Sequence, residues 1–375
     1  MMNRRDLFKV AGAVGVSAAM PAALNATGSV TMGGNAVAKI ELKRLMLRHT
    51  WTTTMSSSAY RDTVHLRYQR DGITGYGEGA PIVRYKEYPE QAKLALDAII
   101  GQIETGDPLK FDKFFAGVRR SLGNHQHAAM AAVDIAICDW LAKKLGMPLY
   151  QYFGLDPADA PVTTFSIGID TPEITRQKTR EAEDFPILKV KVGLQNDEET
   201  IEAIRSVTKK PLRVDANEGW TDKGEAIRKI NWLETQGVEL IEQPMPAHMF
   251  EETKYVRSKV HLPIIADEAC TDASLIPKLK EAYDGVNVKL DKSGGVMEAY
   301  RWIKFARAMD MKVMLGCMVS SSCTVTAAAH LAALVDYPDL DGNLLISNDP
   351  YEGVKVRHGK LILSSGPGLG LKVLA

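Results

Sequence analysis

Five short apolar runs, rich in β-branched residues, recur about every 25 residues, and this spacing constrains the fold more than any other feature of the chain. Each run ends in charged or amide residues. Because the runs lack the alternation of apolar and polar residues that marks a half-exposed strand, they are typical of buried parallel strands. The interval leaves room for one helix after each strand. The runs cover residues 187–192, 212–214, 238–241, 262–265 and 286–290.

The same interval locates further strands on both sides of this stretch. Residues 163–167 lie upstream, residues 312–316 lie downstream, and a weaker candidate surrounds Leu340. Seven or eight consecutive strand–helix units within about 190 residues favour a barrel over an open sheet. We therefore predict an α/β fold built on a (β/α)7β TIM-like barrel. Because the carboxyl ends of barrel strands share one mouth, the polar residues that end the runs would converge there.

The segment before the barrel follows a period of two, with turn glycines between its apolar runs. This pattern predicts an antiparallel meander. A Thr- and Ser-rich stretch between the first two strands has the composition of a loop that could act as a lid. Apolar residues at helical spacing follow. The predicted strands are 40–47 and 63–70, the loop is 49–58, and the helices are 90–105 and 127–145.

These patterns divide the chain into four predicted parts: a leader at 1–33, an α+β capping domain at 37–158, the barrel at 159–345, and a segment at 346–375 that returns to the cap. In the leader, Arg4-Arg5 precedes a short, weakly apolar run that ends in small residues, which resembles a twin-arginine export signal. The run is too short to span a bilayer. We expect export to the periplasm; with a non-functional leader the protein would stay in the cytoplasm.

The composition excludes several classes of function. With 375 residues, 45% hydrophobic content and a formal net charge of +0, the chain has a large core and no charge bias toward nucleic acid or a membrane surface. Its four cysteines lie far apart, so we expect neither disulfides nor a zinc site. We expect a small-molecule substrate and a homo-oligomer.

Three carboxylates end three consecutive predicted strands. Asp215, Glu242 and Asp267 would share the barrel mouth, where three uncompensated negative charges repel one another and are costly to bury. A divalent cation would neutralise them, and ligation by oxygen alone suits Mg²⁺. The alternative is that each acid pairs with a lysine or caps a helix. We predict a magnesium site at these three residues.

Two lysines end the second and sixth predicted strands, which lie opposite each other in an eight-stranded ring. Lys191 and Lys289 would thus flank both faces of a substrate carbon. Metal coordination of the neighbouring carboxylate stabilises the enediolate formed when that carbon loses its proton, so a neutral lysine suffices as base. Removal on one face and return on the other inverts the centre. Lys189 points to the same side of the strand as Lys191. We assign it the role of a positive charge that stabilises the negative enediolate oxygen. The alternative for each lysine is a solvated charge.

At these residues the chain resembles the enolase superfamily, in the branch of muconate lactonizing enzyme. The resemblance covers nearly all of residues 37–370, including 131–146 of the cap. It implies the same barrel and cap, a magnesium ion and acid–base lysines. The motifs that carry it are Lys189-x-Lys191, Asp215-Ala216-Asn217, Glu242-Gln243-Pro244, Asp267-Glu268 and Lys289-Leu290-Asp291-Lys292 followed by Ser-Gly-Gly.

Within this branch, residues 316–322 and the later pair Asp339 and Asp341 resemble the dipeptide epimerases, in which such a pair binds the ammonium group of the substrate. The chemistry agrees, because two carboxylates at i and i+2 suit one cation. The alternative for the pair is a polar turn. The residues that the resemblance implies for positioning the peptide are Thr164 and, through the main chain, Cys317 and Val319.

One departure from the resemblance concerns the lid. Epimerases that act on Ala-Glu often have an arginine in this loop, whereas residues 51–58 contain none and Arg48 and Arg61 flank them. The sequence therefore does not determine which side chain the enzyme prefers at the residue that it inverts.

We predict an isomerase: a Mg²⁺-dependent dipeptide epimerase that inverts the α-carbon of the C-terminal residue of L-Ala-Xaa dipeptides, such as L-Ala-D/L-Glu, in peptidoglycan turnover. The alternatives use the same half-reaction and comprise o-succinylbenzoate synthase, cycloisomerase and N-acylamino acid racemase. A metal- and peptide-binding protein without activity is a further alternative.

Overall fold

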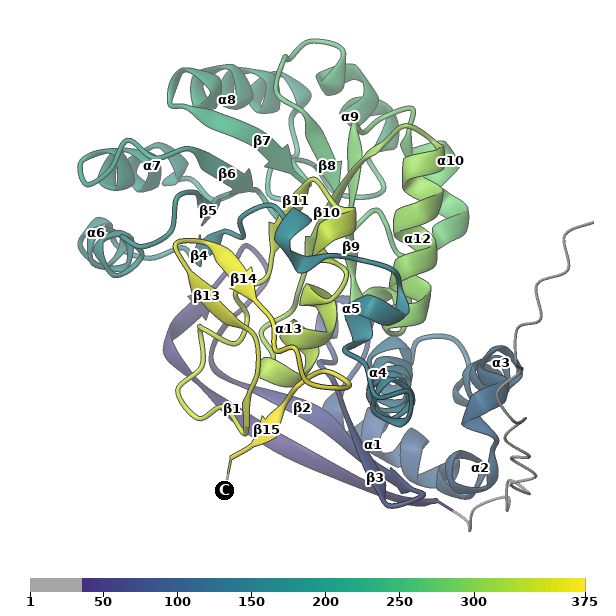
Figure 1. The fold of residues 1–375 in the computed structure, drawn as a ribbon. Coiled ribbons are helices and arrows are strands. Elements are labelled where there is room, and N and C mark those ends of the chain that lie inside the picture. Colours follow the sequence, from purple (N-terminus) through teal and green to yellow (C-terminus); the bar gives the residue numbers. More distant parts are fainter. Residues whose placement is uncertain (1–35, 375) are drawn as a thin grey trace, which may run out of the picture. The chain divides into compact units, whose positions relative to one another are not determined.

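The computed structural model describes residues 36–374, so the predicted leader at 1–33 lies outside the described residues. Eight strands follow one another in sequence order within one parallel sheet, surrounded by helices (Figure 1). The predicted barrel is thereby confirmed. The strands are β4 (Phe165–Ile167), β5 (Leu188–Lys191), β6 (Leu212–Asp215), β7 (Val238–Glu242), β8 (Ile264–Ala266), β9 (Gly285–Lys289), β10 (Lys312–Gly316) and β11 (Tyr337–Asp339).

Side chains join the two ends of this sheet, β4 and β11. Thr163 Oγ1 accepts a hydrogen bond from the main-chain N–H of Leu340 (2.8 Å), and Thr164 Oγ1 donates one to Asp339 Oδ1 (2.6 Å). The two outer strands therefore lie next to each other, as the predicted barrel requires. This junction also places β11, with its acidic residue, beside the first strand.

Helices follow each of the first seven strands, and no helix follows β11 within the described part of the chain, which confirms the (β/α)7β order. In several of them, a side chain caps the first turn. Thr171 accepts from the N–H of Ile174 at the start of α6, and Asp222 accepts from that of Glu225 at the start of α8. The helices are α6 (Pro172–Glu181), α7 (Asp197–Arg205), α8 (Lys223–Thr235), α9 (Phe250–Arg257), α10 (Ile276–Leu279), α11 (Leu290–Ser293), α12 (Val296–Ala308) and α13 (Ser322–Ala329).

The barrel interior has an apolar floor below a charged rim. Leu240, Ile265 and Met314 form a buried cluster against Tyr337. Because successive side chains of a strand point to opposite faces, the residue two positions beyond Leu240 also points inward, and that residue is Glu242. The alternation of the strands thus places charged groups directly above an apolar layer that excludes water.

An antiparallel sheet and a group of helices precede the barrel. The five-residue run Gly75-Tyr-Gly-Glu-Gly lets β3 approach the buried helix α4 closely, since a Cβ at Gly77 would overlap the carbonyl oxygen of Ala132. The predicted helix at 90–105 is two helices separated at Ile99, and the helix α3 was not predicted. The elements are β1 (Val37–Thr52), β2 (Ser57–Arg70), β3 (Ile73–Gly79), α1 (Pro89–Ala98), α2 (Ile100–Thr105), α3 (Phe111–Leu122), α4 (His127–Lys144) and α5 (Leu149–Tyr152).

The predicted lid loop at 49–58 is mostly strand, which corrects the prediction. β1 and β2 continue to a short turn at 53–56, with Trp51 paired to Ser58 across the hairpin. Its Thr, Ser and Trp residues look like a loop by polarity, but Thr and Trp favour extended backbone. The hairpin tip lies on the barrel mouth, because Thr54 Oγ1 donates a hydrogen bond to the carbonyl of Asn217 (2.6 Å).

Buried carboxylates connect the cap to the barrel. Glu78 of β3 accepts hydrogen bonds from the N–H (2.9 Å) and hydroxyl (2.6 Å) of Ser321, at the start of α13. Asp134 of α4 accepts a hydrogen bond from the N–H of Val296 (2.5 Å), at the start of α12. Each carboxylate satisfies main-chain donors that a helix start leaves unpaired. These contacts fix the hairpin relative to the strand tips.

The C-terminal segment lies beside the cap helices. Figure 1 shows its labelled strands β13, β14 and β15 in yellow, and the main-chain N–H of Leu369 donates a hydrogen bond to Asp139 of α4 (2.8 Å). Among residues 36–374, the helices are all too short or too polar to cross a bilayer. The strands are β12 (Tyr351–Glu352), β13 (Lys355–Arg357), β14 (Lys360–Ile362) and β15 (Lys372–Val373).

Candidate active site

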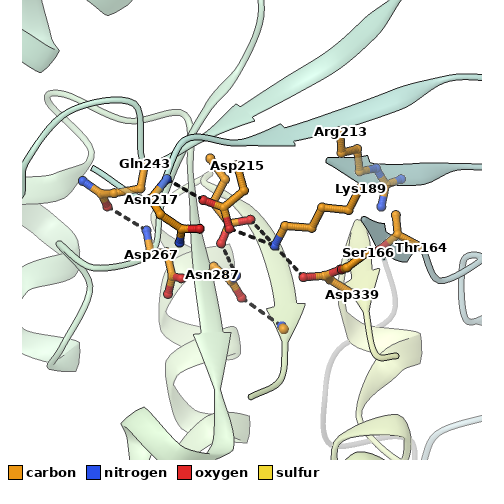
Figure 2. A network of polar contacts seen from close by, with 12 residues as sticks. Thr164, Ser166, Lys189, Arg213, Asp215, Asn217, Gln243, Asp267, Asn287 and Asp339 are labelled. Carbon is orange, nitrogen blue, oxygen red and sulfur yellow. Dashed lines mark hydrogen bonds and ion pairs between the residues drawn. The ribbon is translucent and has the colours of Figure 1, made fainter. Parts of the chain in front are cut away.

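Three carboxylates at neighbouring strand tips face one another in the barrel mouth. Asp215 ends β6, Glu242 ends β7, and Asp267 directly follows β8. One oxygen of each lies within 4.8 Å of the chosen oxygens of the other two, and all three side chains are buried. Figure 2 shows Asp215 and Asp267 pointing into the same space. The structure therefore brings together the three residues that the sequence assigns to a metal.

Buried donors hold each of these carboxylates. Each accepts a hydrogen bond through one oxygen from a donor behind it, and the second oxygen of each faces a lysine ammonium in the mouth. Supports of this kind orient ligands before a metal binds. The donors are the main-chain N–H of Asn217 to Asp215 (2.9 Å), the amide of Asn287 to Glu242 (2.7 Å) and the ammonium of Lys292 to Asp267 (2.6 Å).

The side chain of Gln243, which directly follows β7, connects the end of β8 with Tyr283, two residues before β9. Its side-chain oxygen accepts hydrogen bonds from the N–H groups of Asp267 (2.9 Å) and Ala269 (3.1 Å), and its amide donates to the hydroxyl of Tyr283 (3.0 Å). Its φ of 35° lies in the left-handed region that non-glycine residues rarely adopt. The surrounding hydrogen bonds maintain this strained conformation, which directs the side chain across to β8.

The electrostatics of the site favour a cation. Burial and the negative charge of Asp215 raise the pKa of Glu242 to about 7. Glu242 Oε2 is buried and faces the Lys189 ammonium, 2.6 Å away, whereas Oε2 of the adjacent Glu268 is buried without a hydrogen-bond partner among residues 36–374. Burial and Asp267 raise the pKa of Glu268 to about 8. Three buried carboxylates clustered in this way, with a fourth beside them, fit a divalent ion, and the oxygen-only ligand set suits magnesium.

The two predicted acid–base lysines approach this cluster from different strands. Lys191 ends β5, the second strand of the sheet, and Lys289 ends β9, the sixth. Lys191 Nζ lies 2.5 Å from Asp215 Oδ2, and Lys289 Nζ lies 2.7 Å from Asp267 Oδ2. Burial lowers the pKa of Lys289, but the negative charge of Asp267 raises it by more. With the protein groups alone, the pKa of Lys289 therefore lies above the ordinary lysine value.

Lys189 lies among the carboxylates, deeper than Lys191. Its Nζ is 2.6 Å from Asp339 and from Glu242, and 3.2 Å from Asp215 (Figure 2). Burial opposes the charge, but these acids hold its pKa well above the ordinary value. Lys189 is therefore a fixed positive charge between the triad and β11.

A cavity of about 520 Å³ lies above the strand tips, under the β1–β2 hairpin. Both Lys191 and Lys289 line it, so each amine reaches the space next to the triad. The ring of Trp51 forms part of its roof, with its centre 6.0 Å from the Lys191 amine. The cavity has the size of a small organic ligand.

Asp339, the last residue of β11, and Asp341, which follows that strand, also line this cavity. Asp339 is engaged by Thr164 and Lys189, which hold its pKa at about 2 although burial opposes this. Asp341 accepts one hydrogen bond, from the N–H of Ser166 (2.5 Å), and burial together with Asp339 raises its pKa to about 7. Of these two aspartates, Asp341 is therefore the one whose ionised form a cation in the cavity would stabilise more.

Most of the predicted peptide-positioning residues line the cavity. Cys317, Val319, Asp339 and Asp341 all do, whereas Thr164 lies outside the lining and holds Asp339. Sequence reasoning assigned no role to several residues that the structure places at the site. Three of them, Asn217, Glu268 and Lys292, belong to the motifs that carry the family resemblance, so the sequence could have indicated that they lie at the site. The residues without such a signal are Asn287, Ser166, Arg84 and Tyr85.

Comparisons with known proteins agree with this architecture. Residues 38–154 match the mandelate racemase / muconate lactonizing enzyme N-terminal domain, and residues 173–374 match the enolase C-terminal domain-like family. An L-Ala-D/L-Glu epimerase of Bacteroides thetaiotaomicron is 40% identical over 99% of both chains. An L-Ala-D/L-amino acid epimerase of Pedosphaera parvula is 41% identical over 88% of this chain and 97% of its own.

Solved structures give the same result. The L-Ala-D/L-Glu epimerase of Bacillus subtilis, in a substrate complex, superposes with a TM-score of 0.85 at 26% identity, covering 91% of this chain and 99% of its own. A dipeptide epimerase of Enterococcus faecalis, complexed with Mg and L-Leu-L-Tyr, has a TM-score of 0.82 at 32% identity, covering 90% and 99%. The chain belongs to the mandelate racemase/muconate lactonizing enzyme family of the enolase superfamily, and its relatives there include dipeptide epimerases.

Proposed function

We propose that this protein is a Mg²⁺-dependent isomerase that inverts the α-carbon of the C-terminal residue of an L-Ala-Xaa dipeptide. The observation that carries the proposal is the placement of two amines around one carboxylate cluster. Lys191 and Lys289 come from the second and sixth strands, and both line the same cavity. An inversion by proton transfer needs a base on one face of the carbon and an acid on the other.

The metal would be held by Asp215, Glu242 and Asp267. When bound, it supplies positive charge that stabilises the negative charge on the substrate carboxylate after the α-proton leaves. One of the two lysines takes the α-proton, and the carbon, planar in the enediolate, receives a proton from the other. Because the second proton arrives on the opposite face, the centre is inverted. Lys189, whose Nζ lies 2.6 Å from Glu242, would be the fixed positive charge beside this carboxylate.

The other end of the dipeptide would lie at the acidic pair. Asp341, with one oxygen engaged only by the N–H of Ser166, and Asp339 would bind the ammonium group of the first residue. The main chain near Cys317 and Val319 would position the peptide between the two ends. N-acylated amino acids carry no ammonium group, so this pair favours dipeptides over the substrates of N-acylamino acid racemases or o-succinylbenzoate synthases.

We further propose that the enzyme acts on dipeptides from peptidoglycan turnover, as a homo-oligomer exported to the periplasm. The leader pattern at residues 1–33 supports export, and the names of relatives that act on L-Ala-D/L-Glu support a cell-wall dipeptide. Secretion assays with and without residues 1–33 test the export, and the molecular mass in solution tests the homo-oligomer.

Proton exchange in D₂O, followed by NMR, tests the reaction. The wild-type enzyme should convert L-Ala-L-Glu and L-Ala-D-Glu into each other with deuterium at the inverted carbon, and it should leave N-succinylated amino acids unchanged. Lys191→Ala and Lys289→Ala should each lose epimerisation, by about 10²- to 10⁴-fold. Each variant should keep deuterium exchange with only one of the two stereoisomers. A Lys289→Ala enzyme that epimerises normally would show that the two-base mechanism is wrong.

A further inference from the structure

Glu78 is a fully buried carboxylate of the cap that holds the start of a barrel helix. A Cβ at Gly77 or Gly79 would overlap a carbonyl oxygen of α4, so these two glycines of β3 face that helix. Because the side chains of a strand alternate, Glu78 between them points to the opposite face. There it accepts hydrogen bonds from the N–H (2.9 Å) and hydroxyl (2.6 Å) of Ser321 and from the hydroxyl of Thr324 (3.0 Å). Close packing on one face and these donors on the other fix the position of the carboxylate.

The helix that Glu78 holds directly follows a segment of the cavity wall. Residues 317–321 connect β10 to α13, and the first three of them line the cavity. This segment packs against the acidic pair. The Sγ of Cys317 accepts a hydrogen bond from the N–H of Gly342 (3.3 Å), and a Cβ at Gly342 would overlap the carbonyl oxygen of Met318. A shift of the segment would therefore also move residues 339–342.

A second carboxylate holds the residue next to Ser321. Asp349, in the C-terminal segment, accepts hydrogen bonds from the N–H (3.0 Å) and the hydroxyl (2.7 Å) of Ser322. The amide of Asn343, two residues beyond the acidic pair, donates to the same hydroxyl (3.0 Å). Two carboxylates from outside the barrel thus hold the end of the wall segment, one from the cap and one from the C-terminal segment.

Hydrogen bonds to a carboxylate are stronger than those between neutral groups, so the contact of Glu78 with Ser321 is well suited to fix the wall segment. We infer that Glu78 is a positioning residue for the dipeptide: through Ser321 it fixes the main chain at 317–319 and the acidic pair that packs against it. Glu78 is not part of the cavity lining, so it acts through the segment that it holds. This inference rests on the proposed function and adds the cap residue that sets the affinity for the ammonium end of the substrate.

The proposed chemistry at the α-carbon belongs to lysines on β5 and β9, so a disturbed wall segment should change KM rather than kcat. Steady-state kinetics test this with the dipeptide that the Mg²⁺-loaded wild type epimerises fastest among L-Ala-L-Glu, L-Ala-L-Leu and L-Ala-L-Lys. Glu78→Ala leaves the donors of Ser321 without their acceptor. Its KM should rise about 10-fold, while kcat changes by less than about 3-fold.

Two further variants trace the effect to this contact. Glu78→Gln keeps an acceptor oxygen for the main-chain N–H and should restore most of the affinity. Ser321→Ala removes one donor and should raise the KM in the same direction as Glu78→Ala. Because both alanine substitutions remove the same hydrogen bond, the KM rise of the double variant should be smaller than the product of the two single rises.

Asp134→Ala is the matched control. Asp134 is also a fully buried carboxylate of the cap, and it holds the start of α12 by accepting a hydrogen bond from the N–H of Val296 (2.5 Å). Within the described chain, however, residues 290–295 in front of α12 do not belong to the cavity wall. Asp134→Ala should therefore lower the urea midpoint of unfolding, as Glu78→Ala does, but keep the KM within about 2-fold of the wild type.

The comparison of these variants decides for or against the inference. A KM rise in Glu78→Ala, with the KM of Asp134→Ala near that of the wild type, supports it. An unchanged KM in Glu78→Ala, or equal KM rises in the two variants, overturns it while the epimerase activity stands. If either alanine variant does not fold, Ser321→Ala and Asp134→Asn take their places in the same comparison. A wild type that epimerises no L-Ala dipeptide overturns the proposed function and this inference with it.

Discussion

Asn287→Ala measures how much the support behind the carboxylates contributes to the metal site. Asn287 is fully buried on β9, its amide donates to Glu242 (2.7 Å), and its oxygen accepts from the N–H of Gly316 (2.9 Å). Losing a hydrogen bond to a charged acceptor costs about 1.5–3 kcal/mol, and a buried N–H without an acceptor costs about 1–3 kcal/mol. We expect the free energy of unfolding of the metal-free protein to fall by about 3–5 kcal/mol.

The same change should weaken magnesium binding, because Glu242 loses the contact that orients it. We expect the dissociation constant for Mg²⁺ to rise about 10- to 100-fold. Calorimetric titration at pH 8 measures it with Glu242 ionised, since its pKa is raised to about 7. Urea unfolding with EDTA and with excess Mg²⁺ gives a second readout, in which the stabilisation by the ion shrinks by about 1.4–2.7 kcal/mol.

A matched substitution separates this effect from general damage. Asn231→Ala removes the same side chain from the exposed surface of α8, and it should change the free energy of unfolding by no more than about 0.5 kcal/mol. An Asn287→Ala protein that binds Mg²⁺ as tightly as the wild type would refute the reasoning that this amide prepares Glu242 for the metal.

Three further predictions follow from the same contacts. Burial and Asp339 raise the pKa of Asp341 to about 7, and only the ionised carboxylate binds an ammonium group. The KM for the dipeptide should therefore fall as the pH rises from 6 to 8. Asp341→Asn should raise the KM and remove this pH dependence. Gly295 has a φ of 118°, and a Cβ there would overlap Asp134, so Gly295→Ala should lower the free energy of unfolding by about 2–4 kcal/mol, measured by urea titration. Removal of divalent ions with EDTA should abolish α-proton exchange and lower the melting temperature, and Mg²⁺ should restore both; full exchange after exhaustive chelation would contradict the metal requirement.

The lid shows where local sequence patterns mislead. Polarity at 49–58 suggested a loop, yet Trp51 and Ser58 pair across a hairpin that continues β1 and β2. The strand continues because its neighbours pair with it and its tip contacts the barrel, and both are contacts between distant segments. Arg61 was visible as a flanking arginine, but that it lines the cavity depends on the register of β1 with β2. A shift by one residue would turn it outward.

Local sequence patterns also do not identify the buried hydrogen-bond donors that support the carboxylates. Asn287 follows a valine in the middle of a strand, and nothing in its neighbours marks it as the partner of Glu242, 45 positions earlier. The resemblance assigns Thr164 to the peptide, and only the structure shows that its hydroxyl donates a hydrogen bond to Asp339 (2.6 Å). Both contacts exist because the sheet curves until residues far apart in the chain become neighbours.

The sequence by itself determined the barrel, its strand order and the residues at the strand tips, because a buried parallel strand and the helix after it leave a local, repeating pattern of apolar and polar residues. Only the tertiary structure decided which donor supports each carboxylate, which cap residue holds the cavity wall and what roofs the cavity. These depend on packing between segments far apart in the chain, and no local pattern records that packing.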